Sequence, residues 1–442
     1  MIRTRTKIFL LALAMALLLV AGVLLLRHQR AAGPLGDADA LKLFNEVLTR
    51  VSQSYVEKVE DKKLIQGAIN GMLAALDPHS AFMPPTSFQE MKVSTSGEFG
   101  GLGIEITIRD GKLTVVSPIE DTPAYRAGIR AGDHIVRIGD ESTRGMSINS
   151  AVKRMRGVKG TKVTIHIMRQ EFAEPRPFTL ERDIIRVRSL RSASLLPGFG
   201  YIRISQFQER TGNDFIAALE KLRAENNGTL KGLVLDLRNN PGGLLDQAVA
   251  VANRFIGEGS GDPLIVYTKG RTESSRTVFN ATLGEKEPRY PIVVLINGGS
   301  ASASEIVAGA LQDHRVAVIM GTQSFGKGSV QSILPLRGGN GLLLTTARYY
   351  TPSGRSIQAK GITPDIHVPQ RDISEPDGKM PKGREIREED LVNHFESDRS
   401  PESAPTGPFL KLDPQYAKDF QLVRAVELLR GWETFKRLDR NP

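Results

Sequence analysis

The 442-residue chain contains no cysteine. This absence excludes disulfide bonds, and it also excludes a lipid-attachment cysteine behind an export signal. If the chain is exported, the absence of disulfides is more typical of a protein of the bacterial cell envelope than of a small secreted protein held together by disulfides.

The sequence also lacks a concentrated basic surface, although its net charge is +10. Five basic residues lie in the first thirty positions with no acidic residue among them, so half of the excess belongs to that short segment. The other half is spread along the remaining chain, and no basic stripe is interleaved with aromatic residues. We therefore expect no nucleic-acid partner.

Long hydrophobic runs are absent except at residues 8–26, which read IFLLALAMALLLVAGVLLL after the basic start MIRTRTK. A basic segment before such a run directs export or membrane insertion. Its nineteen residues are many for a cleaved signal and close to a full bilayer span, and no clean small-x-small cleavage site follows. Residues 1–30 are therefore a signal peptide or an N-terminal membrane anchor, and the sequence leaves both open. We expect a protein of the periplasm or cell envelope, either free or anchored to the inner membrane.

Hydrophobic residues make up 40% of the chain, enough for more than one core. Apolar residues at three- and four-residue spacing predict an N-terminal helical region, after which short alternating strands predict a β-rich module. From about residue 199, apolar strands alternate with amphipathic helices, which predicts a buried, mostly parallel sheet. A charged, proline-containing stretch then separates this α/β core from a last helix. The expected boundaries are 37–95 for the helical region, 96–171 for the β-rich module, 186–370 for the α/β core, 371–412 for a partly disordered linker and 413–442 for the C-terminal helix.

A lysine between two glycines, in the loop GTQSFGKGSV at 321–330, admits three chemistries. Gly321 to Lys327 resembles a phosphate-binding loop, but it lacks the final Ser or Thr and the helix that such a loop needs. Ser324 and Lys327 form the S-x-x-K pattern of penicillin-binding enzymes, but the flanking glycines oppose a helix and the companion S-D-N and K-T-G motifs are absent. The third chemistry is a neutral lysine that serves as base for a serine elsewhere.

The stretch INGGSASASEIVAGAL at 296–311 offers such a serine. Its apolar start predicts a strand and residues 303–311 predict a helix, which places Ser302 at the strand-to-helix turn. Backbone amides at a helix N-terminus can stabilise a developing oxyanion. An ordinary N-cap serine is the alternative for a serine-rich turn.

The lysine base must be neutral, and lowering a lysine pKa from about 10.4 to near 7 costs about 4–5 kcal/mol, which burial can supply. Lys327 follows the next strand of the expected sheet and can reach the same edge as Ser302. Gln331 could orient the lysine nitrogen without adding charge. His314 is the rival base, but we expect it at the far end of the serine's helix.

GSASASEI followed by GTQSFGKGSVQ, with LDLRNNPGG upstream and GLGIEI in the module before it, closely resembles the carboxyl-terminal processing peptidases, also called tail-specific proteases. The likeness covers about residues 38–370. It implies a crotonase/ClpP-like α/β protease core with an inserted PDZ domain and an N-terminal helical region. Ser302 matches the family's nucleophile, Lys327 its general base and Gln331 the residue that orients the lysine. The oxyanion hole would use the amide of Ala303 and one from the NNPGG turn, at Gly243 or Gly242.

The resemblance also implies that residues 96–171 form the PDZ domain. Successive amides at Gly101, Leu102, Gly103 and Ile104 can form a nest for a C-terminal carboxylate, and the peptide would add as a strand to IEITI at 104–108. A flexible turn is the plainer interpretation of these glycines.

The implied activity is hydrolysis of peptide bonds in proteins with free C-termini, through an acyl-enzyme and without a metal or cofactor. Envelope proteins and peptidoglycan-remodelling enzymes are among the family's substrates, and its members often form homo-oligomers or use an adaptor or activator protein. The alternative is a PDZ-containing binding or scaffold protein with an inactive or resting core. An acyl-binding crotonase-like enzyme is a weaker third possibility. The joint presence of Ser302, Lys327 and Gln331 favours the protease, because a scaffold has no need of this polar set.

Overall fold

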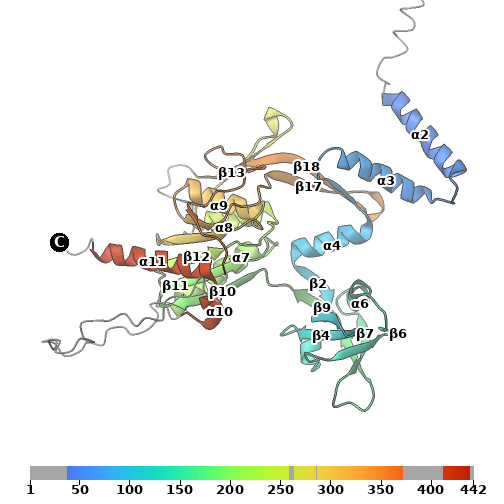
Figure 1. Cartoon of the computed structure of the whole chain (residues 1–442), viewed down its shortest axis with the longest axis horizontal. Coiled ribbons are helices and arrows are strands. Elements are labelled where there is room, and N and C mark those ends of the chain that lie inside the picture. The colour runs from blue at the N-terminus through green and yellow to red at the C-terminus, as the bar shows by residue number, and fades with distance from the viewer. Residues whose placement is uncertain (1–36, 258–262, 285, 372–411, 439–442) are drawn as a thin grey trace, which may run out of the picture. The chain divides into compact units, whose positions relative to one another are not determined.

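The computed structural model describes residues 37–257, 263–284, 286–371 and 412–438 (Figure 1). The hydrophobic segment at 8–26 and nearly all of the expected linker lie outside the described residues. Among the described helices, none combines the length and the apolar character needed to cross a membrane. The part before Met83 and the part from Met83 onward form separate compact units, and each is described by itself.

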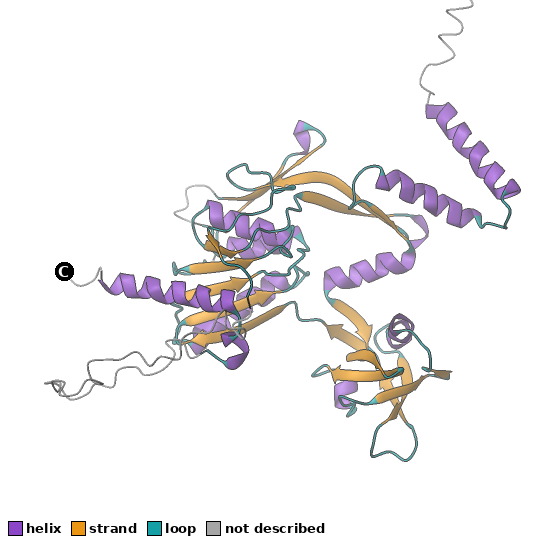
Figure 2. Ribbon diagram, viewed as in Figure 1, coloured by secondary structure: helices purple, strands orange, loops and turns teal. Residues whose placement is uncertain are grey.

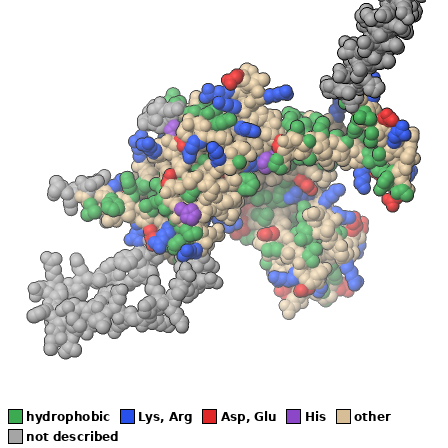
Figure 3. All heavy atoms as spheres, turned by 45° about the horizontal axis from the view of Figure 1, so that its top comes forward, with side chains coloured by type: hydrophobic (Ala, Val, Ile, Leu, Met, Phe, Trp, Pro, Cys, Tyr) green, Lys and Arg blue, Asp and Glu red, His purple; other side chains and the backbone are tan. Residues whose placement is uncertain are grey.

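The N-terminal part consists of α2 (Asp37–Ser54) and α3 (Asp61–Ala74), and ends in the short strand β1 (Ala81–Met83). The helical character predicted for this region is confirmed. Several of their apolar side chains remain exposed, as the green patches on these helices in Figure 3 show. The exposed apolar residues are Leu41, Leu43, Phe44, Val47, Ile65 and Met72.

A β-rich module follows α4 (Pro85–Ser96). Its sheet has the order β3-β4-β5-β7-β8, with β6 paired to β5, and a separate pair joins β2 to β9. The strands predicted from the alternating pattern are confirmed, and β3 lies at an edge of the sheet. The elements are β2 (Glu98–Gly101), β3 (Ile104–Arg109), β4 (Lys112–Pro118), α5 (Pro123–Arg126), β5 (His134–Ile138), β6 (Glu141–Ser142), α6 (Ile148–Met155), β7 (Lys162–Met168), β8 (Arg176–Glu181) and β9 (Asp183–Arg186).

The α/β core is built on a sheet of order β10-β11-β12-β15-β16-β19. Only the first pair is antiparallel, which confirms the mostly parallel sheet expected from the sequence. Every residue of β12 and β15 is buried, as strands covered on both faces must be. The strands are β10 (Leu190–Leu196), β11 (Phe199–Ile204), β12 (Gly232–Asp236), β15 (Ile292–Ile296), β16 (Val318–Gly321) and β19 (Ile366–His367).

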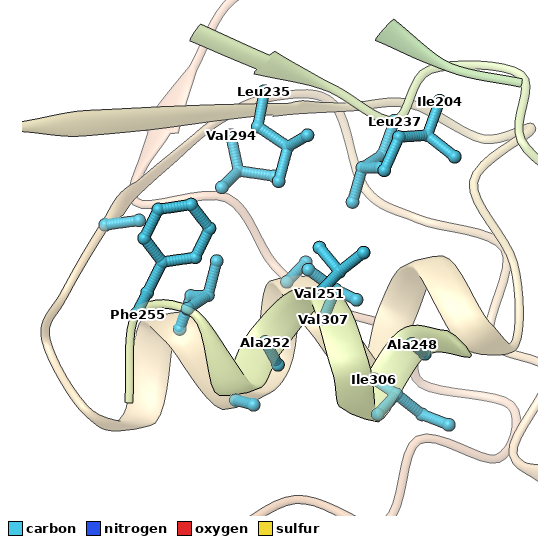
Figure 4. Packing of buried hydrophobic residues seen from close by; sticks show 14 of the residues in the cluster. Ile204, Leu235, Leu237, Ala248, Val251, Ala252, Phe255, Val294, Ile306 and Val307 are labelled. Carbon is cyan, nitrogen blue, oxygen red and sulfur yellow. The ribbon is translucent and has the colours of Figure 1, made fainter. Parts of the chain in front are cut away.

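Helices cover both faces of this sheet. Figure 4 shows one face, where Val251 of α8 and Val307 of α9 pack towards Leu235 and Val294 of the strands. On the other face, apolar residues of the C-terminal helix α11 pack in one cluster with residues of β12, β15 and β16. The helices are α7 (Thr211–Glu225), α8 (Leu245–Asn253), α9 (Ala303–Asp313), α10 (Pro414–Ala417) and α11 (Phe420–Leu438).

A second sheet contains β13 (Leu264–Gly270), β14 (Thr277–Asn280), β17 (Ser329–Pro335) and β18 (Gly341–Tyr350). The ribbon in Figure 2 shows its long strands as a layer apart from the parallel sheet. The sequence analysis expected no helix after the lysine loop, but it did not predict that β17 pairs with β18, and β18 with β13, in a separate sheet. Strand β17 leads directly out of the lysine loop, so this second sheet fixes one end of that loop.

Candidate active site

Ser302 lies at the turn between β15 and α9, where it is the N-cap of the helix. Its backbone has φ 55° and ψ −112°, a conformation that a residue with a side chain rarely adopts. Strain of this kind costs about 1–3 kcal/mol and is kept mainly at functional sites. Ser302 is 8% exposed, so its surroundings are largely shielded from water.

A buried carboxylate joins the Ser302 turn to the lysine loop. Glu305 Oε2 accepts the backbone N–H of Ser302 at 2.7 Å and that of Lys327 at 2.9 Å. Its Oε1 accepts the hydroxyl of Ser324 at 2.6 Å and the backbone N–H of Gly326 at 2.7 Å. Two residues that are remote in the sequence are therefore held against one oxygen atom.

Burial raises the pKa of Glu305, and the four hydrogen bonds offset part of this rise. All four contacts are made by donors, which suits the ionised carboxylate. The sequence analysis missed Glu305, although Ser-x-x-Glu before an apolar helix is the capping-box pattern and was a usable signal. The pattern marks the helix start, but it does not show that the carboxylate also binds a distant loop.

Lys327 lies in an extended loop between β16 and β17. No helix includes residues 322–328, and a strand follows them, which rules out both the phosphate-loop and the S-x-x-K interpretation. The flanking glycines allow a close approach to residues 358–361. Gly326 has φ 92°, and a Cβ at Gly328 would lie 2.4 Å from the backbone nitrogen of Gln358.

Gln331 lies on β17, just after the lysine loop. Its Nε2 donates to the hydroxyls of Ser329 at 2.9 Å and Thr345 at 3.3 Å. These contacts hold the amide on the paired strands β17 and β18. Its orienting effect on Lys327 stays a prediction.

The NNPGG turn packs directly against the Ser302 turn. A Cβ at Gly242 would lie 2.8 Å from Ser302 Cβ and 2.9 Å from the backbone nitrogen of Ala303, and its φ is 101°. Only glycine fits such an approach. Asn240 strengthens the contact, because its backbone oxygen accepts from Ala301 N at 2.9 Å and from Ser304 Oγ at 2.9 Å.

The two glycine amides of this turn differ in their partners. Gly242 N–H donates to Asn240 Oδ1 at 2.9 Å, so it is already engaged. The backbone of Phe207 forms two hydrogen bonds with this turn: its N–H donates to Gly242 O, and its O accepts from Leu244 N–H. Neither bond uses the N–H of Gly243. Within the described part of the chain, Gly243 N–H and Ala303 N–H have no acceptor.

A buried ionic network holds the start of the NNPGG turn, and the sequence analysis missed it. Arg238 donates to both carboxylate oxygens of Asp236, at 2.9 and 2.7 Å, and to both of Asp419, at 2.9 and 2.6 Å. Gln421 Oε1 accepts a further bond from Arg238 at 2.9 Å. The C-terminal helix thus contributes to the base of this turn.

His314 is the C-cap of α9, at the opposite end of that helix from Ser302. Eleven helical residues separate the two ends, which is ~16 Å at 1.5 Å per residue. The His314 ring contacts the carbonyl of Leu264 at 2.7 Å. The structure therefore places His314, the rival candidate for the base, away from Ser302.

Three family models match parts of this chain. The model of peptidase family S41 matches residues 198–368, a PDZ domain model matches 90–168, and the model of the activating protease CtpB N-terminal domain matches 27–86.

Among curated relatives, the carboxy-terminal-processing protease of Bartonella bacilliformis is 48% identical over 398 residues, which cover 88% of each chain. The carboxy-terminal processing protease CtpA of Bacillus subtilis is 34% identical over 384 residues, covering 87% of this chain and 77% of that protein. A solved structure of a photosystem II D1 C-terminal processing protease is 30% identical in sequence. The match covers 74% of this chain and 92% of that protein's chain, with a TM-score of 0.42. The chain belongs to peptidase family S41, and it is a serine peptidase of the carboxy-terminal processing type with a PDZ domain.

Proposed function

We propose that this protein is an endopeptidase that captures C-terminal tails with its PDZ domain and cleaves peptide bonds with Ser302 as nucleophile and Lys327 as base. The observation that carries the proposal is the Glu305 carboxylate, which binds the backbone amides of both residues. Because both backbone N–H groups donate to the same oxygen, Glu305 Oε2, the backbones of Ser302 and Lys327 lie close together. This proximity is what a serine–lysine pair requires.

In the proposed reaction, the Ser302 hydroxyl proton passes to Lys327 Nζ while Oγ bonds to the substrate carbonyl carbon. The carbonyl electrons move to its oxygen, and the amides of Ala303 and Gly243 stabilise the resulting charge. Collapse of this intermediate breaks the C–N bond, and Lys327 returns the proton to the leaving amine. Water then hydrolyses the acyl-enzyme by the same route, with Gln331 orienting the lysine.

The choice of Gly243 over Gly242 rests on their hydrogen bonds. Gly242 N–H is committed to Asn240, whereas Gly243 N–H and Ala303 N–H have no acceptor in the described residues. A buried donor without a partner costs about 1–3 kcal/mol, so a substrate oxygen that pairs with both amides would be stabilised.

Tail capture is proposed at the edge strand β3 of the PDZ domain. This edge is open for an added peptide strand, and α6 packs beside it. The amides of Leu102 and Gly103, just before β3, have no acceptor within the described ranges, so they can bind a terminal carboxylate. Gly103 has φ 78°, and a Cβ there would lie 2.2 Å from the side chain of Thr122, so a side chain would distort this loop.

We propose that the hydrophobic segment at 8–26 delivers the enzyme to the cell envelope, as its basic start and apolar length favour. Envelope proteins with free C-termini, peptidoglycan-remodelling enzymes among them, are the substrates that fit this location. Assembly into a homo-oligomer and control by an adaptor protein are further expectations from the family.

Degradation of an unfolded model protein tests the assignment. Wild type should cleave it, whereas Ser302→Ala and Lys327→Ala should lose at least a thousandfold in kcat, because removal of either member of such a pair disables the other. Unchanged melting temperatures would show that both variants fold. Cleavage that persists in Ser302→Ala would contradict the proposal, and silence of the wild type even with envelope extract would favour the scaffold.

A further inference from the structure

Tyr349, near the end of β18, contacts the lysine loop and packs with the helix α9 that begins after Ser302. Its backbone nitrogen donates to the carbonyl of Gly328 at 2.7 Å, and Gly328 directly follows Lys327. Tyr349 is 5% exposed and belongs to the same apolar cluster as Ala303 and Ile306 of α9. The tyrosine thus joins the lysine loop to the start of α9 (strand β18 in Figure 1).

The Tyr349 hydroxyl lies within interaction range of the side chain of Ser302. Burial raises the pKa of the phenol to about 12, and the contact with Ser302 offsets only part of this rise. The phenol therefore keeps its proton at neutral pH. A protonated phenol can donate to an oxygen that becomes negative, whereas a second hydrogen-bond acceptor in its place would repel that charge.

We propose that Tyr349 positions the nucleophile, by holding the Ser302 hydroxyl in its reactive orientation and donating a hydrogen bond to Oγ as the serine attacks. This inference rests on the proposed role of Ser302 and Lys327. In the attack, the Oγ–H bond breaks, the proton goes to Lys327 Nζ and the Oγ–C bond forms. Tyr349 keeps its own proton throughout, so it is no base.

The neighbouring residue Tyr350 provides a matched control. Side chains alternate between the two faces of a strand, and the Tyr350 ring stacks on Tyr267 with centroids 5.1 Å apart. Removing the hydroxyl of Tyr350 is the same chemical change on the other face of β18. It leaves the partners of Ser302 intact.

The first experiment compares Tyr349→Phe with Tyr350→Phe in the full-length protein, using cleavage of a peptide and labelling of Ser302 by a fluorophosphonate. One lost hydrogen bond predicts that kcat and the labelling rate both fall about tenfold in Tyr349→Phe, while KM stays within twofold of wild type. Tyr350→Phe should retain both rates. Wild-type rates in Tyr349→Phe would overturn the proposal. A loss as deep as that of Lys327→Ala would also overturn it, because the phenol would then be carrying the proton.

A second measurement tests the contact without using activity. The free energy of unfolding is compared for wild type, Ser302→Ala, Tyr349→Phe and the double variant. A hydrogen bond between the two hydroxyls predicts that the single effects do not add, whereas additivity would refute the contact. If the wild type proved inactive, the serine–lysine mechanism would fail, while this cycle would still decide whether Tyr349 holds Ser302.

Discussion

Replacing Glu305 by glutamine is the sharpest test of how this site is held together. The side chain keeps its shape, but one carboxylate oxygen becomes an NH₂ group. If this group replaces Oε2, it faces the backbone N–H groups of Ser302 and Lys327. If it replaces Oε1, it faces the backbone N–H of Gly326 and the hydroxyl of Ser324, and only the hydroxyl can rotate to accept a bond.

The loss of stability in Glu305→Gln is set by the less costly of these two amide orientations, the one in which the NH₂ group replaces Oε1. At least one buried backbone N–H, that of Gly326, loses its acceptor, which costs about 1–3 kcal/mol. Loss of the charge in the first turn of α9 removes a further ~0.3–1 kcal/mol of helix stabilisation. Burial opposes the charged form of Glu305, so the neutral amide recovers part of this loss. We expect a net destabilisation of about 2 kcal/mol.

The effect on activity should be larger than the effect on stability. Displacing Lys327 by about 1 Å from the serine costs on the order of a hundredfold in kcat. Glu287→Gln is the matched control, because Glu287 is also a fully buried carboxylate and binds Arg223 and Arg254 away from this loop. Urea unfolding and peptide cleavage should show that both variants lose stability, while only Glu305→Gln loses turnover per folded molecule. Wild-type turnover in Glu305→Gln would refute the idea that this carboxylate aligns the pair.

Three further predictions concern other parts of the molecule. Gly242→Ala places a Cβ 2.8 Å from Ser302 Cβ, so peptide turnover should fall at least a hundredfold, and normal turnover would contradict the close packing of the two turns. Asp419→Ala leaves Arg238 with fewer partners and should lower the free energy of unfolding by about 2–3 kcal/mol, which urea titration measures. Burial alone would raise the pKa of Asp419, but the hydrogen bonds and charge of Arg238 lower it overall. Its stabilisation is therefore present above the ordinary pKa of about 3.9 and is lost as the pH falls through the lower folded value, so wild type and Asp419→Ala should converge in stability in acid. Peptides with a free C-terminus should bind at least tenfold more tightly than amidated ones in a fluorescence titration, and equal binding would contradict carboxylate capture at Gly103.

Local patterns predicted much of this molecule. Apolar spacing indicated the N-terminal helices, the strands of the PDZ domain and the mostly parallel sheet, and the structure confirms them. Ser302 could be placed at a helix start because a strand, a glycine-rich turn and a helix follow each other directly. Glycines around Lys327 indicated an extended loop rather than a helix. These features depend on neighbouring residues, whose backbone preferences and side-chain periodicity are visible in the sequence.

The contacts that align the site depend on segments that are remote from one another. Glu305 could be recognised as a capping residue, but only the folded chain brings the backbone of Lys327 to it. Asp419 reaches Arg238 from the position just before the C-terminal helix α11, and Tyr349 lies near Ser302 from a strand of the second sheet. A hydrogen bond tolerates errors of only a few tenths of an ångström, and such proximity results from the packing of both sheets and their helices. The sequence by itself thus determined which residues are the candidates for the chemistry, and the tertiary structure decided which other residues hold them in place.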